Sequence, residues 1–135
     1  MKTIKLKFIA LLGVFAGIGV ACSVDDDANY CFSSRYTEPT GVSGPETTTV
    51  NTPITLSVSY IPLGSCGIFN DFSETTTFPK EIKLLVDYPG CECPPTEEVS
   101  VEPYIFTATT PGEYVLEFLT TNPDEPIVKT ITVTE

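Results

Sequence analysis

The segment Ile54-Thr55-Leu56-Ser57-Val58-Ser59-Tyr60 decides the fold class, because apolar residues and hydroxyl-bearing residues alternate strictly along it. Successive side chains of a β-strand point to opposite faces of a sheet. The alternation therefore predicts a strand with one apolar face toward a core and one wet face toward solvent.

Similar short runs lie on both sides of this segment, separated by Pro, Gly, Asn and Asp residues. The predicted strands are Thr47–Val50, Ile54–Tyr60, Ile82–Val86, Glu97–Val101, Tyr104–Ala108, Tyr114–Thr120 and Ile127–Thr134. Leu63–Phe78 mixes apolar residues with turn formers and gives no clear strand boundaries. Because Pro103 and the neighbouring Pro94 and Pro95 cannot donate to a ladder, Glu97–Val101 is predicted to be an edge strand. About seven short strands and no helical repeat indicate an all-β sandwich.

Residues 28–46 are rich in Ser, Thr, Pro and Gly and are predicted to form an irregular lead-in. Before them, Lys2, Lys5 and Lys7 precede the uncharged run Phe8–Ala21. These 14 residues are too few to span a bilayer, which needs about 20. The chain is therefore expected to comprise a signal peptide at 1–21, a tether and lead-in at 22–46, and a sandwich at 47–135.

Gly19-Val20-Ala21-Cys22 resembles the lipobox of bacterial lipoproteins, with Gly19 where that family usually has Leu. The resemblance implies that Cys22 is lipidated and becomes the mature N-terminus; the alternative is an ordinary cleaved signal peptide. The following segment resembles the acidic surface-export signal of Bacteroidetes lipoproteins, and the residues that carry this likeness are Ser23, Asp25, Asp26 and Asp27. Together they imply a lipid anchor in the outer membrane at the cell surface, with the periplasmic face as the alternative.

Thr110-Pro111-Gly112-Glu113-Tyr114-Val115-Leu116, with Ile131-Thr132-Val133, resembles the final strands of immunoglobulin-like, PKD-like and fibronectin type III-like domains. This resemblance implies an antiparallel immunoglobulin-like β-sandwich with a tyrosine corner, in which the Tyr114 hydroxyl bonds to nearby backbone. Leu116 stands where an antibody domain has its second core cysteine, and the chain has no tryptophan, so a true antibody-type domain is excluded. The spacing of the apolar runs, with Gly90-Cys91-Glu92-Cys93, also resembles small Bacteroidetes lipoproteins, a likeness that implies no activity.

Beyond Cys22, four cysteines remain: Cys31, Cys66, Cys91 and Cys93. In an exported domain of this size an even number of cysteines indicates disulfides. A bond between Cys91 and Cys93 would close a strained ring, so Cys31 and Cys66 are expected to pair with them in either order. The alternatives are thiol exchange, or a thiolate site for Cu(I) or Zn formed by Cys91, Cys93 and Cys66.

The residues from Cys22 onward include 18 acidic and four basic side chains, a formal charge of −14. Nucleic-acid binding needs a basic surface, so that class of partner is excluded. The chain contains no histidine, which excludes Ser-His and Cys-His nucleophile pairs and His-containing zinc sites. Carboxylates at Glu97-Glu98, Glu102 and Asp124-Glu125 could act as an acid and base pair or bind Ca²⁺, but solvated loops are their ordinary role. We expect no catalytic residue, resident metal or cofactor.

These observations predict a lipid-anchored, non-catalytic binding or presentation domain of the cell envelope. Its partners would be the membrane, through the anchor, and a protein or a glycan. The expected binding surface is Ser65–Phe78 together with Gly90–Pro95, and its aromatic residues Phe69, Phe72 and Phe78 could instead belong to the core. The alternatives are a structural accessory subunit of an envelope assembly and a thiolate metal-binding protein.

Overall fold

The computed structural model describes residues 31–135, and this part of the chain contains nine strands and no helix. The strands are β1 (Phe32–Thr37), β2 (Pro39–Ser43), β3 (Thr47–Thr49), β4 (Ile54–Tyr60), β5 (Ile68–Glu74), β6 (Lys80–Pro89), β7 (Ser100–Phe106), β8 (Gly112–Phe118) and β9 (Ile127–Thr134). The predicted signal peptide, Cys22, Ser23 and Asp25–Asp27 lie outside the described residues. Within residues 31–135, no helix has the length and apolar character to cross a bilayer.

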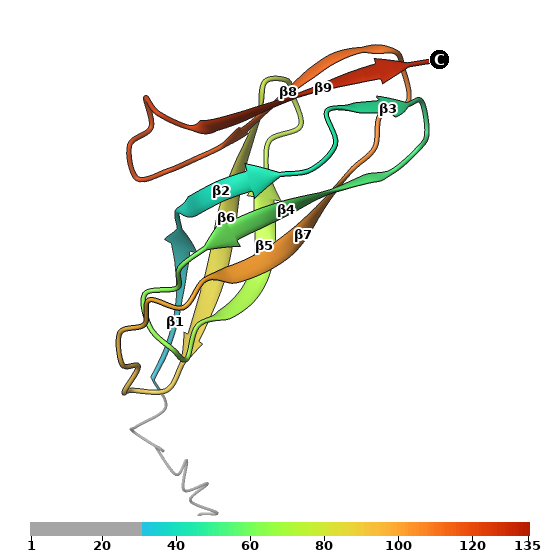
Figure 1. The fold of residues 1–135 in the computed structure, drawn as a ribbon. Helices are drawn as coiled ribbons and strands as arrows, with labels where there is room; N and C mark the ends of the chain where they lie inside the picture. Colours follow the sequence, from blue (N-terminus) through green and yellow to red (C-terminus); the bar gives the residue numbers. More distant parts are fainter. Residues whose placement is uncertain (1–30) are drawn as a thin grey trace, which may run out of the picture.

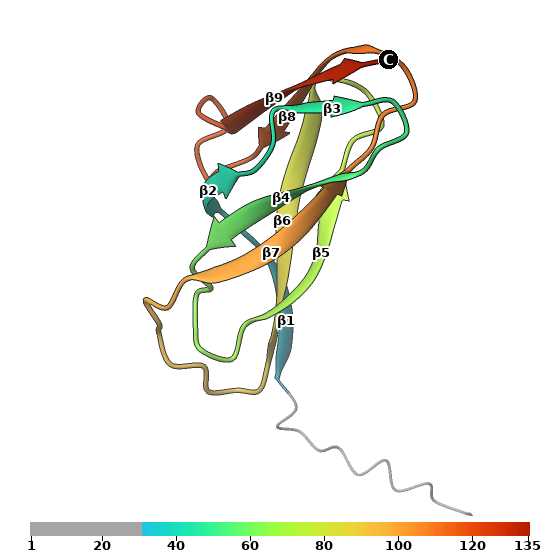
Figure 2. The same cartoon turned by 45° about the vertical axis from the view of Figure 1, so that its right-hand side comes forward.

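The strands form two sheets that enclose one core, as in a β-sandwich. Sheet A has the order β1-β6-β8-β9-β3, with β5 paired to the other edge of β6, and sheet B has the order β2-β4-β7. Figures 1 and 2 show β4 and β7 crossing in front of β5 and β6. The core is built from both sheets, by Leu56, Val58, Tyr60, Tyr104 and Phe106 of sheet B and by Ile82, Leu84, Val86, Tyr88, Leu116, Phe118, Ile131 and Val133 of sheet A. The all-β prediction is confirmed.

Strand β4 has the alternation that its sequence predicts. Leu56, Val58 and Tyr60 are at most 2% exposed, whereas Thr55 and Ser57 are exposed. Because one side chain in two is apolar, the strand buries a single face and its register is fixed.

Strand β6 organises sheet A, because three other strands pair with it. β5 pairs antiparallel along one edge. On the other edge, β1 pairs with residues 84–89 and β8 with residues 80–82. β1 and β8 therefore meet end to end on one side of β6, near Lys83.

The antiparallel arrangement expected from the sequence is wrong for two short pairings. β6 and β8 run parallel over three residue pairs, and so do β3 and β9. β7, in the other sheet, lies between β6 and β8 in the chain, so no hairpin turn sets their relative direction.

The irregular lead-in expected at residues 28–46 is wrong for residues 32–37 and 39–43, which form β1 and β2. Pairing with β6 and β4 satisfies their backbone groups, and this tertiary context overrides a local composition typical of turns. The strands expected at Glu97–Val101 and Tyr104–Ala108 are one strand, β7, which continues through Pro103. β7 is an edge strand, as the prolines predicted.

The tyrosine corner implied by the sequence is present at the start of β8. The Tyr114 hydroxyl donates to the backbone oxygen of Thr110 at 2.9 Å and also lies 2.7 Å from the Thr110 hydroxyl. The ring packs against Phe106 and Phe78, with centroid distances of 5.4 and 4.9 Å. These contacts hold the β7–β8 connection against the sandwich.

Candidate functional site

Two disulfides use all four cysteines of the described chain: Cys31 bonds to Cys91, and Cys66 bonds to Cys93. The prediction of disulfides is confirmed, and the structure has one of the two pairings that the sequence left open. Because every one of these sulfurs is in a disulfide, the alternatives of a thiolate metal site and of thiol exchange find no free thiolate here.

Both disulfides lie at the end of the sandwich where the described chain begins. The β4–β5 loop (residues 61–67) and the β6–β7 loop (residues 90–99) meet there (Figures 1 and 2). The Ser65 amide donates to the Pro94 carbonyl at 2.8 Å, and the Gly90 amide donates to the Cys31 carbonyl at 2.6 Å. A shallow cavity of about 410 Å³ opens beside the disulfides and is also lined by Tyr88. These loops form a covalently braced base.

The structure brings the predicted binding surface together only in part. Ser65–Gly67 lies beside Gly90–Pro95, but β5 then runs away from this end along β6. Phe69 and Phe72 pack against the core, so the core interpretation is confirmed for both. Phe78 is 45% exposed and packs at the far end of the molecule, on the tyrosine corner. The expected surface, as a single patch, is therefore wrong.

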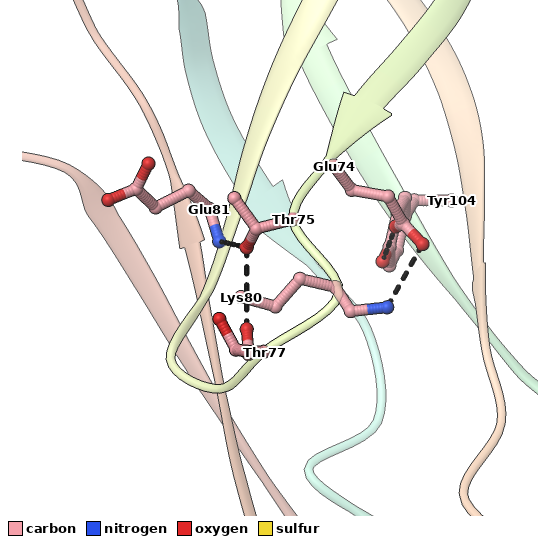
Figure 3. Close-up of polar contacts among 6 residues, drawn as sticks. All are labelled: Glu74, Thr75, Thr77, Lys80, Glu81 and Tyr104. Atoms are coloured by element: carbon pink, nitrogen blue, oxygen red, sulfur yellow. Dashed lines mark hydrogen bonds and ion pairs between the residues drawn. The ribbon is translucent and has the colours of Figure 1, made fainter.

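A polar cluster closes the side of the sandwich where β5 of sheet A faces β7 of sheet B (Figure 3). The Tyr104 hydroxyl donates to Glu74 Oε2 at 2.5 Å, and Lys80 Nζ donates to Glu74 Oε1 at 2.9 Å. In the adjoining turn, the Thr75 hydroxyl accepts from the Glu81 amide at 3.0 Å. Each oxygen of the Glu74 carboxylate thus has a donor, and the cluster ties the two sheets together.

The pKa values of this cluster reflect the same contacts. Burial raises the pKa of Tyr104 well above its usual range, and the neighbouring Glu74 carboxylate raises it further. Burial alone would raise the pKa of Glu74, but the hydrogen bonds from Tyr104 and Lys80 and the Lys80 charge together outweigh it and lower that pKa. The arrangement holds a neutral phenol and a charged carboxylate, which suits a structural latch.

A second cavity, of about 380 Å³, lies where β1 and β8 meet end to end on β6. We call it the β1–β8 notch; it is lined by Tyr36, Thr37, Glu38, Lys83, Leu119, Thr120, Thr121 and Pro123. The notch exists because both strands leave sheet A at this point. After Thr37 the chain crosses to β2 in sheet B, and after Leu119, whose amide bonds to the Ile82 carbonyl at 2.9 Å, it enters the β8–β9 loop.

The side chains of the notch are held by contacts across this gap. Glu38 Oε2 accepts from the Thr121 amide at 3.1 Å and from the Thr121 hydroxyl. These hydrogen bonds lower the pKa of Glu38, so its carboxylate is charged near neutral pH. Tyr36 is 60% exposed, and Lys83 Nζ lies 5.4 Å from the centre of its ring. The notch thus combines an exposed aromatic ring, a cation, an anion and hydroxyl groups.

The carboxylates that the sequence singled out are dispersed over the molecule. Glu97 and Glu98 lie in the β6–β7 loop, Glu102 in β7, and Asp124 and Glu125 in the β8–β9 loop. Among residues 31–135, no three His, Cys, Asp or Glu side chains are grouped so that they could hold a metal ion.

Sequence reasoning missed the residues of the notch. Tyr36 and Glu38 belong to the segment interpreted as an irregular lead-in, and Lys83 lies within the predicted strand Ile82–Val86, to which no binding role was assigned. The one local signal was an aromatic residue in a polar segment, at Tyr36.

Comparisons of this chain with family models, with curated proteins and with solved structures gave no match.

Proposed function

We propose that this chain is a lipid-anchored, non-catalytic binding domain of the outer membrane, exposed at the cell surface, and that the β1–β8 notch is its ligand site. The basic start, the short apolar run and Cys22 support the anchor, and the acidic residues after Cys22 support surface export. We assign the sandwich to the immunoglobulin-like class on the tyrosine corner, and the parallel β6–β8 pair is its departure from that class. The spacing of the apolar runs and Gly90-Cys91-Glu92-Cys93 support a relation to small lipoproteins of the Bacteroidetes.

The observation that carries the proposal is the place of the notch relative to Cys31, the first described residue after the proposed anchor. Eight residues lie between Cys22 and Cys31, so the nine Cα-to-Cα steps from one cysteine to the other span at most about 32 Å. From Cys31, β1 leads away from the braced base, and Tyr36 lies about 17 Å further along it. A ligand approaching from outside therefore reaches the notch without passing the disulfide end.

The chemistry of the notch fits a glycan. The exposed Tyr36 ring offers a flat apolar surface, while its edge and the neighbouring groups are polar. Lys83 can donate to a sugar hydroxyl, and the Thr120 hydroxyl and the Glu38 carboxylate can accept from one. A concave surface with few polar groups around an aromatic ring is a common form of ligand site.

Two experiments test the two parts of this proposal. Cell fractionation should find the wild-type protein in the membrane and the Cys22→Ala variant in the soluble fraction. If the variant stays in the membrane, the anchor is wrong.

For the notch, a glycan array would identify a ligand, and calorimetry would then compare variants. Tyr36→Ala should weaken binding at least about tenfold, a loss of about 1.4 kcal/mol. Ile68→Ala is the matched control, because Ile68 is also 60% exposed on sheet A but lies on β5, away from the notch. Equal affinity of the two variants would place the ligand elsewhere.

A further inference from the structure

The outer face of sheet B carries no charged side chain. Its positions alternate with the buried residues of each strand and pair directly across the sheet, as in Thr55 opposite Ile105 and Ser57 opposite Pro103. We call this surface the sheet B face; its residues are Gly41, Ser43, Thr55, Ser57, Ser59, Val101, Pro103 and Ile105. Apart from Gly41, small hydroxyl side chains and aliphatic side chains make up the whole of it.

The outer face of sheet A, in contrast, carries many charged side chains. On the outward positions of β6 alone lie Glu81, Lys83 and Asp87, and Glu81 pairs with Glu117 of β8. The full chain carries 18 acidic and seven basic residues. A face of three strands without a charge is therefore a distinct feature of this surface and not a consequence of its composition.

The sheet B face is also apolar along its β7 side. Ile105 is 66% exposed and Val101 55%, and Val99, which directly precedes β7 in the chain, is 56% exposed. Such contiguous aliphatic exposure marks an interaction surface more often than isolated apolar residues do. Pro103 has no amide hydrogen, so it interrupts any ladder that a foreign strand could form along the β7 edge. The face is therefore suited to packing against the face of another sheet, with the two sheets about 10 Å apart.

We propose that the sheet B face binds the same face of a second copy of this chain. Two copies with a strong negative charge repel each other in any approach that brings their acidic surfaces together. Contact through the sheet B face keeps charged side chains out of the interface. The contact is isologous, which is the commonest symmetry of homo-oligomers.

The size of the face sets the strength of this contact. Three strands of up to seven residues cover roughly 23 by 15 Å, or about 350 Å² per copy. The total is below the 1,200 Å² or so of a standard stable interface. We therefore expect a weak, reversible dimer in solution, which confinement of both copies to one membrane would strengthen.

Sedimentation equilibrium of the Cys22→Ala chain, which removes any association through lipid, tests this inference. The protein should dimerise as its concentration rises, with a dissociation constant below about 1 mM. That value corresponds to a binding free energy of about −4 kcal/mol. Raising NaCl from about 50 to about 500 mM should strengthen the dimer, because salt screens the repulsion between the acidic surfaces.

Matched variants locate the contact. Thr55→Lys places a charge on the sheet B face and should weaken the dimer at least tenfold. Thr130→Lys makes the same change at an exposed position of β9 in sheet A, and the dimer should stay within about twofold of the parent. A protein that remains monomeric at about 1 mM in high salt overturns the inference, and so does a dimer that Thr55→Lys leaves intact.

Discussion

Replacement of Gly64 by alanine should destabilise the protein, because the new methyl group has no room. A Cβ atom on Gly64 would lie 2.3 Å from Cys93 Sγ, 2.9 Å from the Cys93 carbonyl oxygen and 3.0 Å from the Pro94 carbonyl oxygen. Two of these three neighbours are backbone atoms, and the disulfide to Cys66 and the hydrogen bond from Ser65 hold their loop in place. The clash cannot be relieved by the rotation of one side chain.

The expected magnitude follows from this geometry. Overpacking a well-packed site costs about 1–3 kcal/mol, and a backbone clash belongs in the upper half of that range. For a domain of this size, about 2 kcal/mol corresponds to a fall of roughly 8–16 °C in the unfolding midpoint. Gly41→Ala is the matched control, because no heavy atom lies within 4 Å of its Cβ position. That variant should keep the wild-type stability or gain up to about 1 kcal/mol.

Thermal and urea unfolding, followed by circular dichroism without reductant, measures both variants. The same comparison in a Cys66→Ala/Cys93→Ala background tests the cause. Removing the disulfide should itself cost about 3.5 kcal/mol, since it closes a loop with a sequence separation of 27. Without the Cys93 sulfur, the penalty of Gly64→Ala should fall but not vanish, because the two carbonyl oxygens remain. A Gly64→Ala midpoint within about 2 °C of wild type would refute this account of the loop.

Two further substitutions test the contacts between and within the sheets. Tyr114→Phe removes the hydroxyl that donates to Thr110 and should lower the free energy of unfolding, measured in urea, by about 1 kcal/mol. Tyr36→Phe, at an exposed position, should change the free energy of unfolding by less than about 0.5 kcal/mol. Equal effects of the two variants would argue against a stabilising role of the tyrosine corner. The pKa of Glu74 is lowered below its ordinary 4.5, so its charge stabilises the fold above that pH and this contribution is lost as the pH falls through the folded-state pKa. Glu74→Gln should therefore lower the urea midpoint more at pH 7 than at pH 3, and a difference that does not depend on pH would contradict this assignment.

The sequence predicted the strands whose local pattern agrees with their place in the sheet. β4 is the clearest case, because Leu56, Val58 and Tyr60 all point into the core and their neighbours do not. β1 and β2 were missed because Phe32–Ser43 contains Ser, Pro and Gly, and long-range pairing with β6 and β4 is what makes them strands. Local alternation shows that a strand exists, but it does not show which strand lies beside it.

The candidate sites depend even more on contacts between distant residues, which the local sequence does not show. The cysteines could be counted, but the choice between two pairings depended on which loops meet at the base. The notch joins Tyr36, Lys83 and Thr121, which are far apart in the chain and meet only because two strands end beside each other on β6. No local pattern encodes that meeting.

The bond between Cys31 and Cys91 has a mechanical consequence. If the chain is anchored through Cys22, as proposed, any pull between the cell and a bound ligand enters the sandwich at Cys31. Phe32 pairs with Pro89 at this same end, so without the disulfide the β1–β6 pairing would have to carry the pull. The disulfide instead passes the load to Cys91, just beyond the end of β6, the strand to which β1, β5 and β8 are all attached. The disulfide thus carries load at the attachment point that the β1–β6 hydrogen bonds would otherwise carry.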